Sequence, residues 1–223
     1  MSVEGVGEFR PASSPQKHGA GGESPFKRAF DVVGACALLT FSAPLLAVVA
    51  VAISLDGGPV LFRHKRVGRN GRTFSCLKFR SMAVGADDIL HRYLAENADA
   101  RREWNERRKL TNDPRVTVIG KFIRRTSVDE LPQLINVVRG EMSLVGPRPV
   151  TTDELSFYGR RSWEYMGCIP GITGLWQISG RSGTTYRRRV ALDTLYARRR
   201  TFGLDMEILF RTVPAVLFGR GAE

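Results

Sequence analysis

The sequence has few of the residues that build disulfide frameworks, metal clusters and histidine-centred active sites. Its three cysteines, an odd number, are widely spaced and match no metal-binding pattern. We therefore expect buried thiols in a reducing compartment rather than a disulfide-stabilised secreted protein. Only three histidines occur in 223 residues, which argues against a histidine-centred mechanism. These residues are Cys36, Cys76, Cys168, His18, His64 and His91.

Acidic side chains are also in the minority. Lys and Arg number 34 against 22 Asp and Glu, which gives a formal net charge of +12 at pH 7. Such an excess predicts an acidic partner, which could be nucleic acid, anionic lipid or a phosphorylated substrate. The length fits one domain with a hydrophobic core of its own.

The N-terminal residues lack apolar periodicity. Residues 1–24 are rich in Gly, Ser and Pro, and we predict a disordered tail there. They do not form a signal peptide, because no apolar region follows within the first residues.

Residues 25–56 contain a long stretch without charge. Residues 32–55 carry no Asp, Glu, Lys or Arg, and a run of that length could cross a bilayer as one helix. Pro44 interrupts helical hydrogen bonding, however, and basic residues flank both ends, which places both ends on the cytoplasmic side. We therefore predict a re-entrant helix hairpin, broken near Pro44, that enters one leaflet and returns. A spanning helix and a buried globular helix are the alternatives.

Residues 57–223 are predicted to form a cytosolic domain on the membrane surface. Asn70-Gly71 indicates a hairpin between strands at 60–63 and 72–79. A further strand is expected at 175–178. Helices are expected at 87–109, 157–165, 185–200 and 204–218, the last interrupted at Pro214 and lying at the membrane interface.

Residues 110–150 hold the most unusual combination in the chain. Arg124 lies shortly before the acidic pair Asp129 and Glu130, and the sequence Gly-Pro-Arg-Pro later fixes a rigid turn that carries Arg148. Neighbouring carboxylates within reach of arginines suit phosphate chemistry. One carboxylate oxygen can attack or take a proton, while another holds a metal.

The same residues also fit an ordinary helix start. Ser127 could be the N-cap, with Glu130 closing a capping box. Pro132 would better suit the first position of a helix that begins near Leu131, which would leave the acidic pair exposed just before it. Both interpretations are compatible with anion binding, because the N-terminus of a helix attracts anions.

Further cations lie outside this stretch. Lys78 and Arg80 point the same way on a strand, so both could face one phosphate, although a solvated basic edge is an alternative. The loop that carries Arg181 could hold a diphosphate or be an ordinary glycine loop. Asp193, in the basic helix, is more readily explained as a structural partner of an arginine than as a catalytic group.

Several long sequences resemble the bacterial sugar transferase family of monotopic, membrane-bound phosphoglycosyl transferases. They occur in the family's order and cover roughly residues 26–223. Two departures are notable, because members often carry Arg at the position of Ile169 and Asn at the position of Ser182. The matching sequences are GPVLFRHKRVGRNGRTFSCLKFRSM, LTNDPRVTVIGKFIRRTSVDELPQL, GEMSLVGPRP and PGITGLWQISGR.

This resemblance implies a fold and a set of site residues. The fold would be α/β, mostly helical with a small sheet, seated on the membrane through the re-entrant helix and amphipathic interfacial helices. Asp129 would be the nucleophile, and Glu130 would hold Mg²⁺. The phosphate- or substrate-binding residues would be Lys78, Arg80, Arg124, Arg148, Gln177 and Arg181.

The predicted activity is transfer of hexose 1-phosphate from a UDP-hexose to undecaprenyl phosphate, with release of UMP. It would be the first membrane step of exopolysaccharide or other surface-glycan synthesis, at the cytoplasmic face of the bacterial inner membrane. The sugar would be galactose or glucose, and the route would pass through an aspartyl-phosphosugar intermediate. Inner-membrane lipid would be a further partner, and a homodimer is left open.

Three alternatives remain at this stage. The same transfer could proceed by direct attack in a ternary complex. Alternatively, the chain could be a membrane-tethered nucleic-acid binder or a non-catalytic membrane adaptor. We expect no nucleic-acid partner, because no helix-turn-helix, zinc module or aromatic RNA motif occurs. An adaptor has no need of an acidic pair beside arginines.

Overall fold

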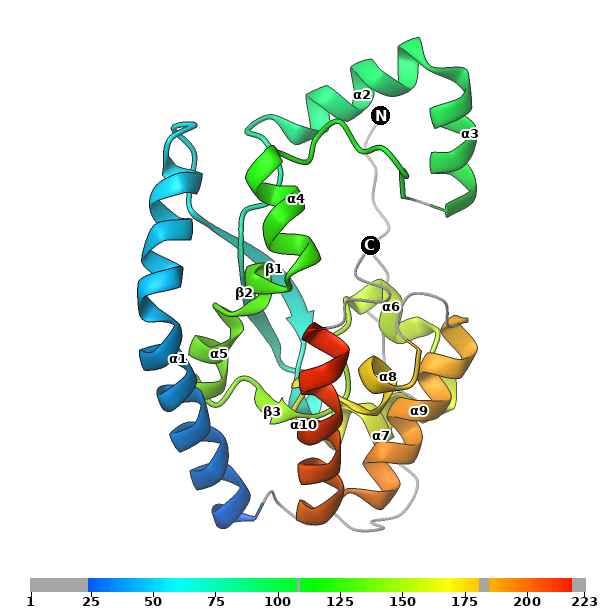
Figure 1. Cartoon of the computed structure of the whole chain (residues 1–223). Coiled ribbons are helices and arrows are strands. Elements are labelled where there is room, and N and C mark those ends of the chain that lie inside the picture. Colours follow the sequence, from blue (N-terminus) through cyan, green and yellow to red (C-terminus); the bar gives the residue numbers. More distant parts are fainter. Residues whose placement is uncertain (1–23, 108, 181–184, 218–223) are drawn as a thin grey trace.

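The computed structural model describes residues 24–107, 109–180 and 185–217. Most of these residues are helical, and the strands form two two-stranded sheets (Figure 1). This confirms the predicted combination of mostly helices with a small sheet. The predicted N-terminal tail, Arg181 and Ser182 lie outside the described residues, apart from residue 24.

Helix α1, Pro25–Ser54, is the long apolar element and runs along one edge of the molecule (Figure 1). Among the described residues it is the one helix long and apolar enough to cross a membrane. The predicted break near Pro44 is wrong, because the helix continues through this residue. Proline removes one helical hydrogen bond, but the remaining bonds and the packing at both ends of α1 keep the helix continuous.

The predicted hairpin is confirmed. Strands β1, Leu61–Val67, and β2, Thr73–Phe79, pair antiparallel, with Leu61 opposite Phe79. The turn η1, Arg69–Gly71, places Asn70 at a φ of 57°, a conformation that asparagine tolerates well. β1 extends further than the predicted strand, since its basic residues keep pairing with β2 up to Val67.

The second sheet joins two short parallel strands, β3, Ser143–Val145, and β4, Gly171–Thr173. The prediction of a strand at 175–178 is wrong, because Leu175–Ile178 forms the short helix α8. The strand lies just before it, at the Pro-Gly-Ile-Thr sequence. Glycine is required at this sheet, since a Cβ on Gly171 would come within 2.0 Å of the Gly146 nitrogen.

The remaining helices form two groups. The polar stretch predicted as one helix is divided into α2, Ala86–Glu96, and α3, Ala98–Arg107, because Asn97 adopts an extended conformation. This pair stands at the end of the molecule far from α9, Tyr186–Arg199, and α10, Phe202–Leu217 (Figure 1).

Helix α10 continues through Pro214, contrary to the predicted interruption. The other elements are α4 (Val118–Arg125), η2 (Val128–Glu130), α5 (Gln133–Arg139), α6 (Thr152–Ser156), η3 (Gly159–Arg161), α7 (Ser162–Met166), α9 (Tyr186–Arg199) and α10 (Phe202–Leu217).

The main core joins α1 to the rest of the domain. Ala35 of α1 packs in one cluster with Val137 of α5, Leu144 of β3 and Ile208 of α10. A buried polar network reinforces this contact, because Lys27 pairs with Asp31 at 2.9 Å and with Asp205 at 3.2 Å. The N-terminal part of α1 is therefore fixed to the strand that leads towards Arg148.

Candidate active site

The acidic pair lies on a short 3₁₀ turn between two helices. α4 ends at Arg125, η2 carries Asp129 and Glu130, and α5 begins at Gln133. The predicted capping box is wrong, because Ser127 has a φ of 57° and its side chain caps no backbone N–H group. The alternative start beside Pro132 is correct. A non-glycine residue in the left-handed region, two positions before Asp129, is a constraint of the kind that concentrates at functional sites.

Asp129 is a buried carboxylic acid. Its residue is 9% exposed, contrary to the exposed position that the sequence suggested. Burial, followed by the negative charge of Glu130, raises the pKa of Asp129 to about 6, against the opposing charges of Lys78 and Arg124. A carboxylate that is poorly solvated and close to two cations is available as a nucleophile near neutral pH.

Glu130 and two cations, Lys78 and Arg124, lie around Asp129. The Lys78 Nζ atom on β2 lies 2.6 Å from the Glu130 Oε1 atom. The Arg124 Nε atom donates to the Ser81 Oγ atom at 2.8 Å, which fixes the guanidinium at the end of α4. The structure therefore brings Lys78, Arg124, Asp129 and Glu130 together, as the sequence predicts.

Arg80 does not converge with Lys78. Its guanidinium pairs with Asp56 in the turn after α1 and donates to the carbonyl oxygens of Pro59, at 2.7 Å, and Ile53, at 3.1 Å. β2 ends at Phe79, so the strand geometry that would align the two side chains no longer holds. In this arrangement Arg80 fixes the C-terminal end of α1.

A second group of cations lies around Trp176 of α8. The guanidinium carbon of Arg148 lies 5.3 Å from the centre of the Trp176 ring, and that of Arg189 lies 4.1 Å from it. Gln177, on the same short helix, donates to the Ile172 carbonyl at 3.4 Å. Sequence reasoning missed Arg189 and Trp176, whose only signal was a basic helix following a tryptophan-containing motif.

Asp193 of α9 is a buried carboxyl group on which Arg148 and Arg189 both act. It is 1% exposed and accepts a hydrogen bond of 2.6 Å from the hydroxyl of Tyr158. Burial raises the pKa of Asp193 to about 6, against the Tyr158 hydrogen bond and the charge of Arg189. These contacts agree with the structural role predicted for Asp193.

The residues around the acidic pair suit a weakly held Mg²⁺. Within the described part of the chain, no group of three His, Cys, Asp or Glu side chains could hold a metal ion. Mg²⁺ keeps several waters and is commonly bound by one or two carboxylates together with substrate phosphates, so it needs no such group. Glu130, 31% exposed at its side chain and beside buried Asp129, has the right chemistry for this role.

Comparison with known proteins shows which family the chain resembles. The bacterial sugar transferase family model matches residues 22–219. The exopolysaccharide production protein ExoY of Rhizobium meliloti is 50% identical over 197 residues, which cover 88% of this chain and 87% of ExoY. The UDP-galactose-lipid carrier transferase of Erwinia amylovora is 51% identical over 196 residues, covering 88% of this chain and 41% of that longer protein.

The undecaprenyl-phosphate galactose phosphotransferase of Salmonella typhimurium is 47% identical over 196 residues, again 88% of this chain and 41% of the relative. The fold and the site place a buried carboxylate among lysine and arginine side chains. The chain belongs to the bacterial sugar transferase family. The predicted enzyme class, a phosphoglycosyl transferase, is thereby confirmed.

Proposed function

We propose that this enzyme transfers hexose 1-phosphate from a UDP-hexose to undecaprenyl phosphate and releases UMP. Relatives are named for transfer to undecaprenyl phosphate or to a lipid carrier. The observation that carries the proposal is the burial of Asp129 beside Glu130, Lys78 and Arg124. The reaction would begin surface-glycan synthesis, as the name of ExoY, an exopolysaccharide production protein, suggests.

The proposed reaction has two steps. First, a carboxylate oxygen of Asp129 attacks the β-phosphorus of the donor, the bond from this phosphorus to the bridging oxygen breaks, and UMP leaves. Then a phosphate oxygen of undecaprenyl phosphate attacks the same phosphorus. The acyl-phosphate bond breaks, Asp129 is regenerated, and the lipid diphosphate sugar departs. Dividing the transfer in this way lets a soluble donor and a bulky lipid use one site in turn.

The surrounding charges would assist the first step. Lys78 and Arg124 depress the pKa of Asp129, so they favour its carboxylate form. The same cations suit the oxygens of the transferred phosphate, for which arginine offers paired donors. Glu130 would hold Mg²⁺, which supplies neutralisation of the diphosphate when bound.

Direct transfer in a ternary complex is less well supported. It would use Asp129 as a base, but a lipid phosphate oxygen is already an anion and has little need of one. A deeply buried carboxylate also has fewer waters to displace before it attacks. We therefore favour the covalent route.

The donor is proposed to be UDP-galactose. Relatives named for galactose are 51% and 47% identical to this chain. Two relatives named for glucose, from Komagataeibacter xylinus and Caulobacter vibrioides, are 44% and 42% identical. The difference is small, so UDP-glucose is the donor to compare first.

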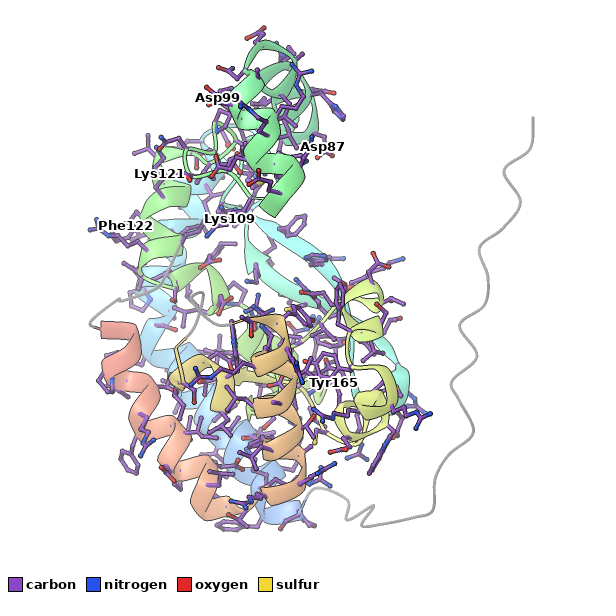
Figure 2. All side chains as sticks on the ribbon, turned by 90° about the vertical axis from the view of Figure 1, so that its right-hand side faces the viewer. Asp87, Asp99, Lys109, Lys121, Phe122 and Tyr165 are labelled. Carbon is purple, nitrogen blue, oxygen red and sulfur yellow. The ribbon has the colours of Figure 1, made fainter. Side chains whose placement is uncertain are left out.

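Attachment to the cytoplasmic face of the inner membrane is also proposed. Phe41 of α1 is 85% exposed, and Val118 of the adjacent α4 is 87% exposed, so apolar side chains cover this edge. Figure 2 shows Phe122 projecting from α4 away from the rest of the molecule. Both ends of α1 pack on the same domain, Asp31 against β3 and Ile53 beside Phe79. A helix held in this way keeps both ends on one side of a bilayer.

The test is an exchange experiment without lipid acceptor. Purified protein in detergent with Mg²⁺ is incubated with labelled UMP and either unlabelled UDP-galactose or UDP-glucose. The covalent route predicts that label enters the UDP-hexose without undecaprenyl phosphate, and that Asp129→Asn abolishes this exchange. If UMP is released only when the lipid is present and no exchange occurs, direct transfer is correct. If neither donor yields UMP with lipid, the proposed reaction is wrong.

A further inference from the structure

A second group of cations, Arg148 and Arg189, lies around Trp176. Glu130, Lys78 and Arg124 are the charged groups that act on Asp129. Arg148 and Arg189 instead act together on Asp193. The two groups of cations therefore act on different buried carboxylates.

Lys78 lies beside the acidic pair, on the β1–β2 hairpin that also carries Arg66. Its charge depresses the pKa of Asp129. On the neighbouring strand β1, the His64 Nδ1 atom lies 3.2 Å from the Arg66 guanidinium, and Arg66 shares Glu154 with Arg189. Cations thus follow one another from Lys78, beside the acidic pair, along the hairpin through Arg66 to Arg189. A row of this kind suits a ligand that carries more than one phosphate.

The group around Trp176 contains polar atoms without partners. Trp176 is 6% exposed, and its indole N–H has no hydrogen-bond partner among the described residues. The buried Nε atoms of Arg148 and Arg189 likewise have none there. Each of these three atoms is an N–H donor, and buried donors of this kind are normally satisfied. A ligand with several acceptor oxygens would satisfy all three donors.

The positive charge of the group is only partly balanced. The Arg189 guanidinium lies 4.0 Å from the Glu154 Oε1 atom. Glu154 is already shared, because its Oε2 atom accepts from Arg66 at 2.7 Å and from the Thr151 backbone at 2.8 Å. Two carboxylates, Glu154 and the buried Asp193, thus face three arginines, Arg66, Arg148 and Arg189. An anion would relieve this excess.

Packing holds Arg189 in a fixed orientation. Its guanidinium carbon lies 4.1 Å from the ring centre of Trp176 and 4.9 Å from that of Tyr186. Stacking between aromatic rings orients the planar donor fork before a ligand arrives. Because arginines cover the Trp176 ring, the cluster is better suited to an anion than to stacking of a base.

We propose that Arg148, Arg189 and the Trp176 indole N–H bind the nucleoside-linked phosphate of the donor, which is the phosphate that leaves in UMP. This assignment rests on the proposed function, with the transferred phosphate beside Asp129. The Gln177 Oε1 atom also lacks a partner in the described part of the chain and could accept from a ribose hydroxyl. Arg189 is thus a substrate-binding residue that sequence reasoning did not identify.

The test compares three variants of α9 in the intact protein. Arg189→Ala removes the cation, and Arg189→Lys keeps the charge without the planar stack. Arg188→Ala is the matched control, since Arg188 is exposed on the same helix. UMP binding is measured by calorimetry, the KM for UDP-galactose by UMP release, and adduct discharge by adding undecaprenyl phosphate to preformed adduct.

Losing a charge-assisted contact to the phosphate should weaken UMP binding about 10- to 100-fold in Arg189→Ala and raise the KM by a similar factor. Arg189→Lys should lie between Arg189→Ala and wild type. Discharge of adduct by lipid should stay unchanged, because UMP has already left. Arg188→Ala should match wild type throughout.

Two results would overturn the inference. The first is UMP binding in Arg189→Ala equal to that of Arg188→Ala while the wild type turns over, which would leave the proposed function intact. The second is an equal loss of UMP binding and adduct discharge together with a lower melting temperature, which would assign Arg189 a structural role. A wild type that neither exchanges UMP nor transfers sugar would instead refute the proposed function, and UMP calorimetry would still decide whether the anion site exists.

Discussion

Replacing Asp129 by asparagine should stabilise the folded protein while abolishing its proposed activity. The side chain is almost fully buried, and it lies beside a second carboxylate. Keeping a negative charge in such a place opposes folding, and function is the reason to keep it. The change to asparagine retains the shape and removes the charge.

The expected size follows from the pKa of Asp129. Burial and the charge of Glu130 raise this pKa from 3.8 to about 6. Between these two values the folded state binds more protons than the unfolded state, so stability falls as the pH rises through this window. Above it the charged carboxylate costs about 3 kcal/mol, since one pKa unit corresponds to about 1.36 kcal/mol. Asparagine must still be hydrogen-bonded, so we expect a net gain of about 1–3 kcal/mol.

Thermal unfolding in detergent measures this gain. For a chain of this size each kcal/mol raises the melting temperature by about 2–4 °C. At about pH 8 Asp129→Asn should melt higher than the wild type, and at about pH 5 the difference should shrink, because the wild-type carboxyl is then protonated. Asp153→Asn, at an exposed position, is the control and should melt as the wild type does. An Asp129→Asn variant that melts at or below the wild-type temperature at about pH 8 would refute the reasoning.

Four further predictions concern the same site. The rate of adduct formation should depend on pH with a midpoint at or below about 6, since Mg²⁺ favours the Asp129 carboxylate, and should fall about tenfold per pH unit below it. A midpoint above about 7 would contradict this assignment. Chelation by EDTA should abolish UMP release and leave the melting temperature unchanged, because substrate supplies most of the metal contacts; a lower melting temperature would indicate a structural metal. Lys78→Ala should lower kcat/KM about 10- to 100-fold through loss of a charged contact to phosphate, whereas Lys121→Ala, on α4, should have no effect on UMP release. Arg80→Ala should lower the melting temperature and leave the KM for UDP-hexose unchanged, since its donors bind Asp56, Pro59 and Ile53; a higher KM with an unchanged melting temperature would restore its predicted phosphate role.

Local signals predicted those parts of the fold that depend on neighbouring residues. Asn70-Gly71 fixed the hairpin because few other pairs tolerate the required backbone angles. Thr185 marked the start of α9, where its side chain accepts from the Arg188 N–H. Elements that depend on tertiary packing were missed. α1 continues through Pro44 because both of its ends are fixed by distant residues. Residues 175–178 form α8 rather than a strand because β4, just before them, already pairs with β3.

The candidate site divides in the same way. Asp129 and Glu130 are adjacent in sequence, and Lys78 lies on strand β2, where it pairs with Glu130, so their association could be predicted. Arg80 could not be assigned, because its partner Asp56 lies in a turn that sequence does not place. Arg189 and Trp176 are 13 positions apart on separate helices, and only their ring contact in the folded chain relates them.

The most direct test of the central claim is the intact mass of the purified protein after UDP-galactose is added with Mg²⁺ and without lipid. The covalent route predicts a gain of one hexose phosphate that is absent in Asp129→Asn and lost when undecaprenyl phosphate is added. An unchanged mass in a preparation that releases UMP once the lipid is present would contradict Asp129 as the nucleophile.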